Sequence, residues 1–333
     1  MTPEPSAELF LGVDAGNSKT VAVVADAAGT VQGYARAGRG DIYGSPTEAE
    51  AVTEVMKAVQ AALDQATTTR RVRRAAFCLA GLDWDSDRRY WAEQLDRLPW
   101  LDSYSLRNDG FALLRAGRSD GVGVALAAGT GAAVVGRGRA GQEWSASFWI
   151  THPIGGGALG GSAMRAVMRA ELGLGPATTL KQTLLDVHGF DDMDSMLEGF
   201  TSRGRRWQQH AHAARAVLDA ASAGEPVAVA LVQEQAQAVA DYLVIAMRKV
   251  DLASADVSVV LGGSVLTGDN PILRDAARRA IATVLPLAAV VVARRSPVVG
   301  AAAEAIAEGS GPLTEEILDR LAGHSYPIDF LLT

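Results

Sequence analysis

The sequence predicts an α/β protein of two similar halves, each built on a β-sheet with helices packed against it. Two observations predict this class. Short β-prone runs alternate with segments of helical periodicity along most of the 333 residues. In addition, an apolar strand that ends in a glycine turn near residue 15 has a counterpart from Gly121 onward.

The first half opens with an apolar run, residues 9–13, that ends on Asp14 and turns through small polar residues. Residues 21–25 are β-prone again, so the polar segment is predicted to be a hairpin turn between two strands. The further elements expected here are strands over 30–37, 74–80 and 103–107 and helices over 86–98 and 109–115. This order of elements is that of a ribonuclease-H-like domain.

A helix is expected to begin after the glycine-rich loop 38–44, which holds Asp41. Ser45 is predicted as its N-cap and Pro46 as its first residue, with Glu48 placed for a capping box. Apolar residues follow at helical spacing, so this helix is predicted to pack one face against the sheet.

The second half repeats the plan with a larger helical part. A strand over 122–128, the turn Ala128-Gly129-Thr130-Gly131 and a returning strand over 132–136 open it. Helices are then expected over 163–172, 178–187, 191–200, 207–221 and 226–250, followed by a strand over 257–261, a helix over 271–285, a strand over 288–292 and a helix over 298–307. The last of these is predicted to complete the second copy.

Composition limits the classes of partner. The formal net charge is −7 and the pI is near 5.3, so we expect neither nucleic acid nor an anionic membrane as the main partner. The one cysteine, Cys78, lies in an apolar run and is read as a buried small hydrophobe. No secretory signal is visible and no apolar run is long enough to span a bilayer, so a cytoplasmic protein is predicted.

The hairpin after Asp14 has the chemistry of a phosphate cradle. Gly16 permits a close turn, Lys19 adds a cation, and Asn17, Ser18 and Thr20 supply polar groups and backbone N–H donors. Asp14 is placed to orient Mg²⁺ through its water shell. A Walker loop is absent, so a P-loop NTPase is excluded. An ordinary hairpin turn is the alternative reading.

Asp109 is the candidate general base for transfer of a phosphoryl group to a hydroxyl. It follows a strand and precedes a helix N-terminus, whose dipole favours the ionised carboxylate, and Asn108 stands beside it. The alternative is that Asp109 only caps the helix that follows. Gly262 and Gly263, with Ser264, also follow an apolar strand, where either a flat ligand or a tightly packed helix can approach the backbone.

These motifs together resemble the BadF/BadG/BcrA/BcrD ATPase family, within the sugar kinase, Hsp70 and actin superfamily, and specifically its N-acetylglucosamine and glucosamine kinase branch. The resemblance runs nearly end to end and rests on Asp14-Ala-Gly-Asn-Ser-Lys-Thr20, Leu79-Ala-Gly-Leu-Asp83, Arg107-Asn-Asp109, Ala128-Gly-Thr-Gly131, Leu261-Gly-Gly-Ser264 and Ser296-Pro-Val-Val-Gly-Ala-Ala302.

The resemblance implies an α/β fold of two ribonuclease-H-like domains around an ATP cleft, over residues 1–117 and 118–333, and it leaves open whether the final helix returns to the first domain. It implies a metal site at Asp14, nucleotide contacts at Gly16, Asn17, Ser18, Lys19, Thr20, Gly129, Thr130, Gly131, Gly262, Gly263 and Ser264, catalysis by Asp109, and sugar contacts at Asp41, Gly81, Asn108, Asp109, Gly155 and Gly156.

Two departures from the family bear on the substrate. The kinases usually carry a Gly-Asp pair before a glycine-rich segment, whereas this chain reads Thr151-His152-Pro153-Ile-Gly155 there and has no acid. Asp41 stands where N-acetyl-sugar enzymes commonly have Asn, so a free amino sugar paired with Asp41 is one hypothesis. His152 is read either as a replacement hydrogen-bonding group or as a loop residue. Trp144, Phe148 and Trp149 are read either as sugar-stacking or as core aromatics.

The function expected is ATP- and Mg²⁺-dependent phosphorylation of an amino hexose, glucosamine or N-acetylglucosamine, at its 6-hydroxyl. A non-catalytic nucleotide- or metabolite-binding protein of the same fold is the alternative, and another amino-sugar or polyol acceptor is a third. The family's iron–sulfur branch needs two thiolates per chain, which Cys78 alone cannot supply. A small-molecule sugar is the expected partner, and a homodimer is left open.

Overall fold

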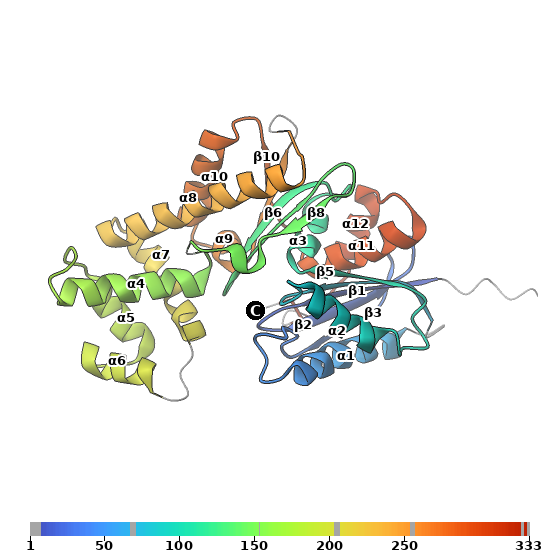
Figure 1. Cartoon of the computed structure of the whole chain (residues 1–333), viewed down its shortest axis with the longest axis horizontal. Helices are drawn as coiled ribbons and strands as arrows, with labels where there is room; N and C mark the ends of the chain where they lie inside the picture. The colour runs from blue at the N-terminus through green and yellow to red at the C-terminus, as the bar shows by residue number, and fades with distance from the viewer. Residues whose placement is uncertain are drawn as a thin grey trace, which may run out of the picture.

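The computed structural model describes residues 8–66, 71–152, 154–202, 207–253, 257–327 and 330–331. Two lobes, each with a five-stranded sheet, lie one above the other in Figure 1, and a third group of helices extends to one side of the upper lobe. The predicted α/β class with two sheets is confirmed.

The first sheet has the order β3-β2-β1-β4-β5. Its strands are β1 (Leu9–Ala15), β2 (Thr20–Ala25), β3 (Val31–Ala37), β4 (Val72–Leu79) and β5 (Tyr104–Asn108). β1, β2 and β3 pair antiparallel as the two predicted hairpins, whereas β4 and β5 run parallel to β1. As a result the carboxyl ends of β1, β4 and β5, which carry Asp14 and Asn108, meet at one edge.

Two helices cover one face of this sheet, α1 (Glu48–Gln65) and α2 (Asp85–Leu95). The prediction of Ser45 as the N-cap of α1 is wrong. Thr47 is the N-cap, and its side chain accepts a hydrogen bond from the Glu50 amide. The physical reason is that the Ser45 amide is already bonded to the Asp41 carbonyl, which holds residues 41–45 in a turn before the helix begins.

The second sheet has the order β10-β9-β6-β7-β8. Its strands are β6 (Gly123–Ala128), β7 (Ala132–Arg137), β8 (Glu143–Ser145), β9 (Ser258–Gly262) and β10 (Ala289–Val292). β6 and β7 form the predicted hairpin, and β9 lies parallel to β6. The glycine turns after β6 and β9 therefore lie at the same edge of the sheet, as the turn after β1 does in the first lobe.

The helices of the second lobe are α4 (Gly156–Glu171), α5 (Leu180–His188), α6 (Met193–Thr201), α7 (Ala214–Ser222), α8 (Pro226–Lys249), α9 (Ser264–Thr267) and α10 (Ile272–Val284). α4 begins seven residues before the predicted position, within a glycine-rich segment of low helix propensity. The glycines are needed for packing, because a Cβ at Gly160 would lie 1.9 Å from the His210 carbonyl oxygen. The single helix predicted over 207–221 is a 3₁₀ segment (Trp207–Ala213) followed by α7.

Two helices cross between the lobes. α3 (Gly110–Gly117) follows the last strand of the first sheet, yet Phe111, Leu113 and Leu114 pack against the second sheet. α11 (Pro297–Ser310) follows the last strand of the second sheet, yet it packs on β1 and β4 of the first, where a Cβ at Gly12 would lie 2.0 Å from the Ala302 nitrogen. The expectation that residues 298–307 complete the second copy is therefore wrong.

α12 (Glu315–Ala322) was not predicted, although Thr314 marks its start as a side-chain N-cap. It packs beside α11 in the first lobe (Figure 1). The division at residues 117 and 118 separates the strands of the two sheets, and the domain limits stay a prediction. Over the described residues no single helix reaches the length and apolarity of a membrane span; only a bent pair, Gln209–Ser222 with Pro226–Lys249, passes that test jointly.

Candidate functional site

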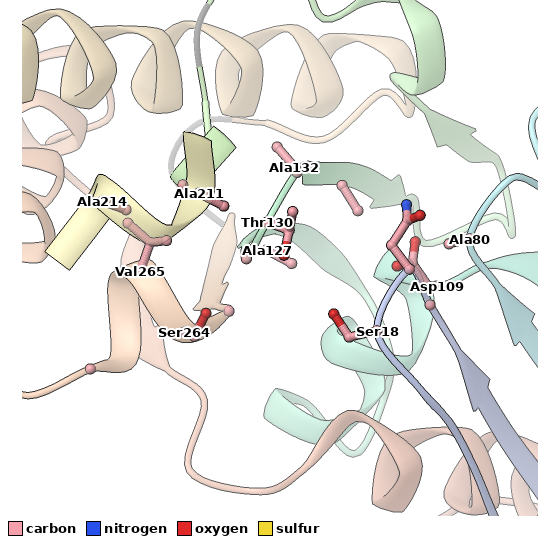
Figure 2. A pocket seen from close by; sticks show the side chains of 18 of the residues that line it. Ser18, Ala80, Asp109, Ala127, Thr130, Ala132, Ala211, Ala214, Ser264 and Val265 are labelled. Carbon is pink, nitrogen blue, oxygen red and sulfur yellow. The ribbon is translucent and has the colours of Figure 1, made fainter. Parts of the chain in front are cut away.

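A cavity of about 1180 Å³ lies between the lobes, where the polar turns of both sheets meet. In Figure 2, Asp109 and Ala80 lie at one end, Ala214 and Val265 at the other, and Ser18 and Thr130 between them. A cavity of this size has room for a nucleotide and a small acceptor together.

Asp14 is at the carboxyl end of β1 and lines the cavity. Its backbone pairs with Val21 on one side and Cys78 on the other, which fixes its position. Burial raises the pKa of Asp14 to about 6, and Lys19 offsets part of this shift. A carboxylate that is costly to ionise without a partner suits a place where a cation binds.

Asp109 lies directly before α3 and lines the cavity. Its side chain makes no capping hydrogen bond to α3; the Gly110 amide donates to Asn108 Oδ1, at 3.1 Å, and also acts on the Asp109 carboxyl by lowering its pKa against the effect of burial. Burial, with the neighbouring carboxylates of Asp14, Asp83 and Asp41, raises the pKa of Asp109 to about 8, so the expectation that the helix dipole keeps this carboxyl ionised is wrong. The capping alternative therefore does not account for Asp109, and its carboxyl group is available to a ligand.

Asp41 lies in the loop before α1, with 5% of its surface exposed. Its two carboxylate oxygens are both engaged, Oδ2 by the Asn17 side-chain amide and Oδ1 by the Tyr43 backbone amide at 2.9 Å. Gly81, with φ +75°, lies against Asp41, since a Cβ there would be 2.5 Å from Oδ1. Through these two hydrogen bonds, Asp41 connects the turn of the first hairpin to the loop over residues 38–44.

Asp83, which the sequence analysis gave no role, also lines the cavity. Its Oδ1 accepts hydrogen bonds from Ser147 Oγ at 2.6 Å and from Asn108 Nδ2 at 3.2 Å. Burial, followed by the effect of neighbouring charges, raises the pKa of Asp83. The only sequence signal for it was its place at the end of the Leu79–Asp83 motif.

The second lobe contributes backbone rather than charge near the middle of the cavity. The amides of Gly156 and Gly157 at the start of α4 donate to the carbonyls of Gly129 and Thr130, at 2.7 and 2.9 Å. A Cβ at Gly129 or Gly131 would meet no atom within 4 Å, so these positions border open space that a ligand can fill. The turn after β6 therefore presents backbone, with no side chain beyond Thr130, to the middle of the cavity.

Gly263 adopts φ +85°, and a Cβ there would lie 2.4 Å from the Ala128 backbone. The turn after β9 therefore packs directly against the turn after β6, and only a glycine fits at this contact. α9 begins at the next residue, at the cavity wall. Beyond it, α7 and the loop before α10 close the far end of the cavity with Arg215, Leu218, Asp219, Asp269 and Asn270.

Most of the residues predicted for the site come together here. Those that line the cavity are Asp14, Gly16, Asn17, Ser18, Lys19, Asp41, Gly81, Asn108, Asp109, Gly129, Thr130, Gly131, Gly156, Gly263 and Ser264. Three do not: Thr20 is fully buried, Gly155 packs against Gly131, and a Cβ at Gly262 would meet Leu113. Lys19 donates a hydrogen bond to the Leu331 carbonyl.

The three aromatic residues differ: Trp149 is 69% exposed and lies neither in the core nor in the cavity wall. Trp144 packs against the core of the second lobe, whereas Phe148 lines the cavity and stacks on Trp84 with ring centroids 6.0 Å apart. His152 is exposed and outside the cavity wall, with its ring 6.3 Å from that of Tyr242. Pro153, on which the missing-acid departure partly rested, lies outside the described residues.

Over the described residues, no three His, Cys, Asp or Glu side chains converge as a complete metal site. Mg²⁺ rarely uses such a cage and is commonly held by one or two carboxylates together with substrate phosphates. Asp14, at the edge of the glycine turns, fits that arrangement. The donor set therefore agrees with a metal that enters with a nucleotide.

Two ribonuclease-H-like sheets with a cavity between their turns are the fold of sugar kinases and actin-like ATPases. Within it, the chain belongs to the BadF/BadG/BcrA/BcrD ATPase family, whose model matches residues 11–305. The chain is similar to N-acetyl-D-glucosamine kinase of Dictyostelium discoideum, 26% identical over 264 residues, which are 74% of this chain and 82% of that protein.

Solved structures share the fold. A Chromobacterium violaceum protein, provisionally named an N-acetylglucosamine kinase, superimposes with a TM-score of 0.70 at 23% identity and covers 91% of this chain and 100% of its own. A ROK family glucokinase from Streptomyces griseus, solved with glucose and AMPPNP, gives a TM-score of 0.56 at 19% identity, with coverage of 89% and 98%.

Proposed function

We propose that this protein is an ATP-dependent kinase that phosphorylates an amino hexose, glucosamine or N-acetylglucosamine, at the 6-hydroxyl. The observation that carries the proposal is the position of Asp109, a carboxyl group whose side chain makes no helix-capping hydrogen bond and which lines the same cavity as the glycine turns of both lobes. Family membership and the similarity to a kinase of this kind support the nucleotide and the acceptor class.

In this proposal the residues divide the work along the cavity. Gly16 to Lys19 and Gly129 to Gly131 hold the phosphates, with Ser264 and the residues of α7 around the nucleoside. Asn108 and Asp41 face the sugar. Mg²⁺ beside Asp14 would neutralise charge on the phosphates.

Asp109 accepts the proton of the sugar hydroxyl as its oxygen attacks the γ-phosphorus of ATP, the bond to the bridging oxygen breaks and ADP leaves. Its pKa near 8 means that it is largely protonated at neutral pH without ligands. A cation bound near Asp14 or Asp41 lowers the pKa of Asp109 and so favours the ionised base. Closure of the lobes then excludes water, which limits hydrolysis of the nucleotide.

The test measures ADP release with Mg²⁺ and ATP over a panel of hexoses and amino sugars, together with the thermal stability of the protein with and without nucleotide. Release that depends on an amino hexose supports the proposal. Stabilisation by nucleotide without release for any sugar would instead indicate a nucleotide-binding protein. Cytoplasmic location, the absence of membrane and nucleic-acid partners, and a homodimer stay predictions.

A further inference from the structure

The loop after β8 closes one end of the cavity by reaching from the second lobe to the first. It contains the short 3₁₀ helix Ser147–Trp149. Ser147 donates to Asp83, and the Phe148 ring lies between Trp84, in a parallel stack, and Tyr43, at 5.3 Å in an edge contact. These contacts join the two lobes beside the acidic wall, by which we mean Asp41, Asp83, Asn108 and Asp109.

The loop holds an unfavourable backbone conformation to make these contacts. Ser147 has φ +47°, a value that non-glycine residues rarely adopt because it is sterically unfavourable. Its hydroxyl bonds Asp83 Oδ1 at 2.6 Å and is 3.2 Å from the Ser145 hydroxyl. The strained residue is thus the one that fixes the Asp83 carboxylate from across the cavity.

Asp41 and Asp83, two carboxylates of the acidic wall, differ in whether one of their oxygens remains without a hydrogen-bond donor. Both oxygens of Asp41 accept hydrogen bonds from the chain. The hydrogen bonds to the Asp83 side chain from the described residues both go to Oδ1, which leaves Oδ2 without a donor. Of the two, Asp83 has the oxygen that a ligand can use.

The charge around this oxygen favours a cationic ligand group. Asp41, Asp87 and Asp83 lie close together, and Asp87 is already satisfied by the Asp83 and Trp84 amides and the Tyr43 hydroxyl. Among the described residues that line the cavity, the lysine and arginine side chains are Lys19, beside Asp14, and Arg215, on α7. Neither belongs to the acidic wall, so its carboxylates have no cation of their own.

We propose that Asp83 is a specificity-determining residue, whose Oδ2 binds the ammonium group of a free amino sugar while Oδ1 is held by Ser147 and Asn108. This inference rests on the proposed function and names the acceptor more narrowly, as an amine rather than an N-acetyl amide. It also assigns to Asp83 the role that the sequence suggested for Asp41. Because Ser147 belongs to the second lobe and Asp83 to the first, their hydrogen bond links the two lobes at the amine site. Binding of the amine to Asp83 and closing of the lobes at this end of the cavity therefore stabilise each other.

The test compares the dissociation constants of glucosamine, glucose and N-acetylglucosamine by calorimetry. The unaltered protein is expected to bind glucosamine more tightly than the two uncharged sugars. Asp83→Asn is expected to weaken glucosamine roughly 10–100-fold, the value of a hydrogen bond to a charged group, and glucose far less. Asp85→Asn, a change of an exposed carboxylate two residues away, is the matched control and is expected to leave all three constants unchanged.

Two results would overturn the inference. The first is that the unaltered protein binds glucose or N-acetylglucosamine as tightly as glucosamine. This measurement does not depend on whether any variant folds. The second is an unchanged ratio of glucosamine to glucose affinity in Asp83→Asn. Ser147→Ala, which keeps the charge, is expected to weaken both sugars a few-fold with the ratio retained, and loss of the ratio there would also contradict the role of the Asp83 charge.

Binding and turnover separate this inference from the proposed function. Amine-selective binding that Asp83→Asn abolishes, without ADP release for any sugar, would leave Asp83 in place and remove the kinase. Equal ADP release from glucosamine, glucose and N-acetylglucosamine would keep the kinase and remove the role of Asp83. With glucosamine as substrate, Asp83→Asn is expected to raise KM for the sugar and leave KM for ATP unchanged.

Discussion

The half-buried carboxylates of Asp14 and Asp109 in the cavity and the buried carboxylate of Glu304 have opposite electrostatic surroundings. In the cavity, Asp14 and Asp109 lack a compensating cation close enough to overcome burial, and their pKa values rise to about 6 and 8. Glu304, on α11, is 2% exposed, and although burial alone raises its pKa, Arg137, Arg115 and Arg107 lower it to about 2. The same chemical group is therefore left uncompensated at one place and fully paired at the other.

The difference follows from what each group does. Glu304 bonds Arg137 Nη2 on β7 at 2.6 Å and Arg115 Nε on α3 at 2.5 Å, so it ties the crossing helix α11 to elements of the second lobe. Its partners are part of the chain. The cavity carboxylates face a space that a cationic or metal-bound ligand can enter, so their partners come from outside. The first three predictions below test this contrast between the carboxylates, and the last tests a similar contrast between two glycines.

The largest effect is expected from Asp109→Asn. Asparagine keeps the shape but cannot accept the proton, so kcat should fall by roughly 10²–10⁴-fold. The measurement is ADP release with saturating ATP and sugar. Stabilisation by nucleotide should persist in the variant, which shows that the cavity is intact. Undiminished turnover would remove the assignment of Asp109 as base.

Glu304→Gln is expected to lower the free energy of unfolding by about 3–5 kcal/mol, because it leaves buried arginines without their counter-charge. Chemical denaturation measures this change. Glu315→Gln, which removes a partner of Arg295 on the surface, is the control and should cost no more than about 1 kcal/mol. Sugar turnover per folded molecule should stay near that of the unaltered protein; a kcat loss like that of Asp109→Asn would break the contrast.

The pH dependence of stability should differ in sign for the two groups. The raised pKa of Asp109 means that its contribution is present below pH 4 and is lost as the pH rises through 8. The lowered pKa of Glu304 means that its contribution is present above pH 4.5 and is lost as the pH falls through 2.

Thermal unfolding between pH 4 and pH 8 tests the predicted loss of the Asp109 contribution to stability. The melting temperature of Asp109→Asn should approach that of the unaltered protein near pH 4 and exceed it increasingly up to pH 8, by the equivalent of about 1–3 kcal/mol. A variant that is less stable than the unaltered protein at pH 8 would show that the Asp109 charge is compensated within the chain.

The smallest effect is expected from a pair of glycines in the second lobe. Gly263→Ala should destabilise the fold by about 1–3 kcal/mol, because φ is +85° and the new Cβ would meet the Ala128 backbone. Gly129→Ala adds its Cβ to open space, so stability should hardly change while nucleotide affinity falls. Equal stability of the two variants, measured by denaturation, would contradict the contrast between packing and ligand-facing glycines.

Several elements of the site were predictable because their local patterns are strong. The hairpin after Asp14 and the strand before Asn108 combine an apolar run with polar residues at its end, and the structure brings both to the cavity. Thr20, in the first of these motifs, and Gly262, in the motif that ends β9, face the core instead, because successive residues of a strand point to opposite sides. A motif therefore located the turn without deciding which of its residues border the cavity.

By itself, the sequence determined the two sheets and the turns that end their central strands. It also placed Asp14 and Asp109 beside turns of the first lobe. These features could be predicted because periodicity and turn chemistry are local properties. Only the tertiary structure decided that α3 and α11 exchange lobes and that Glu304 meets its three arginines. It also decided that Ser147 reaches Asp83, 64 residues away in the chain. Contacts of this kind depend on how the lobes pack, which no short stretch of residues encodes.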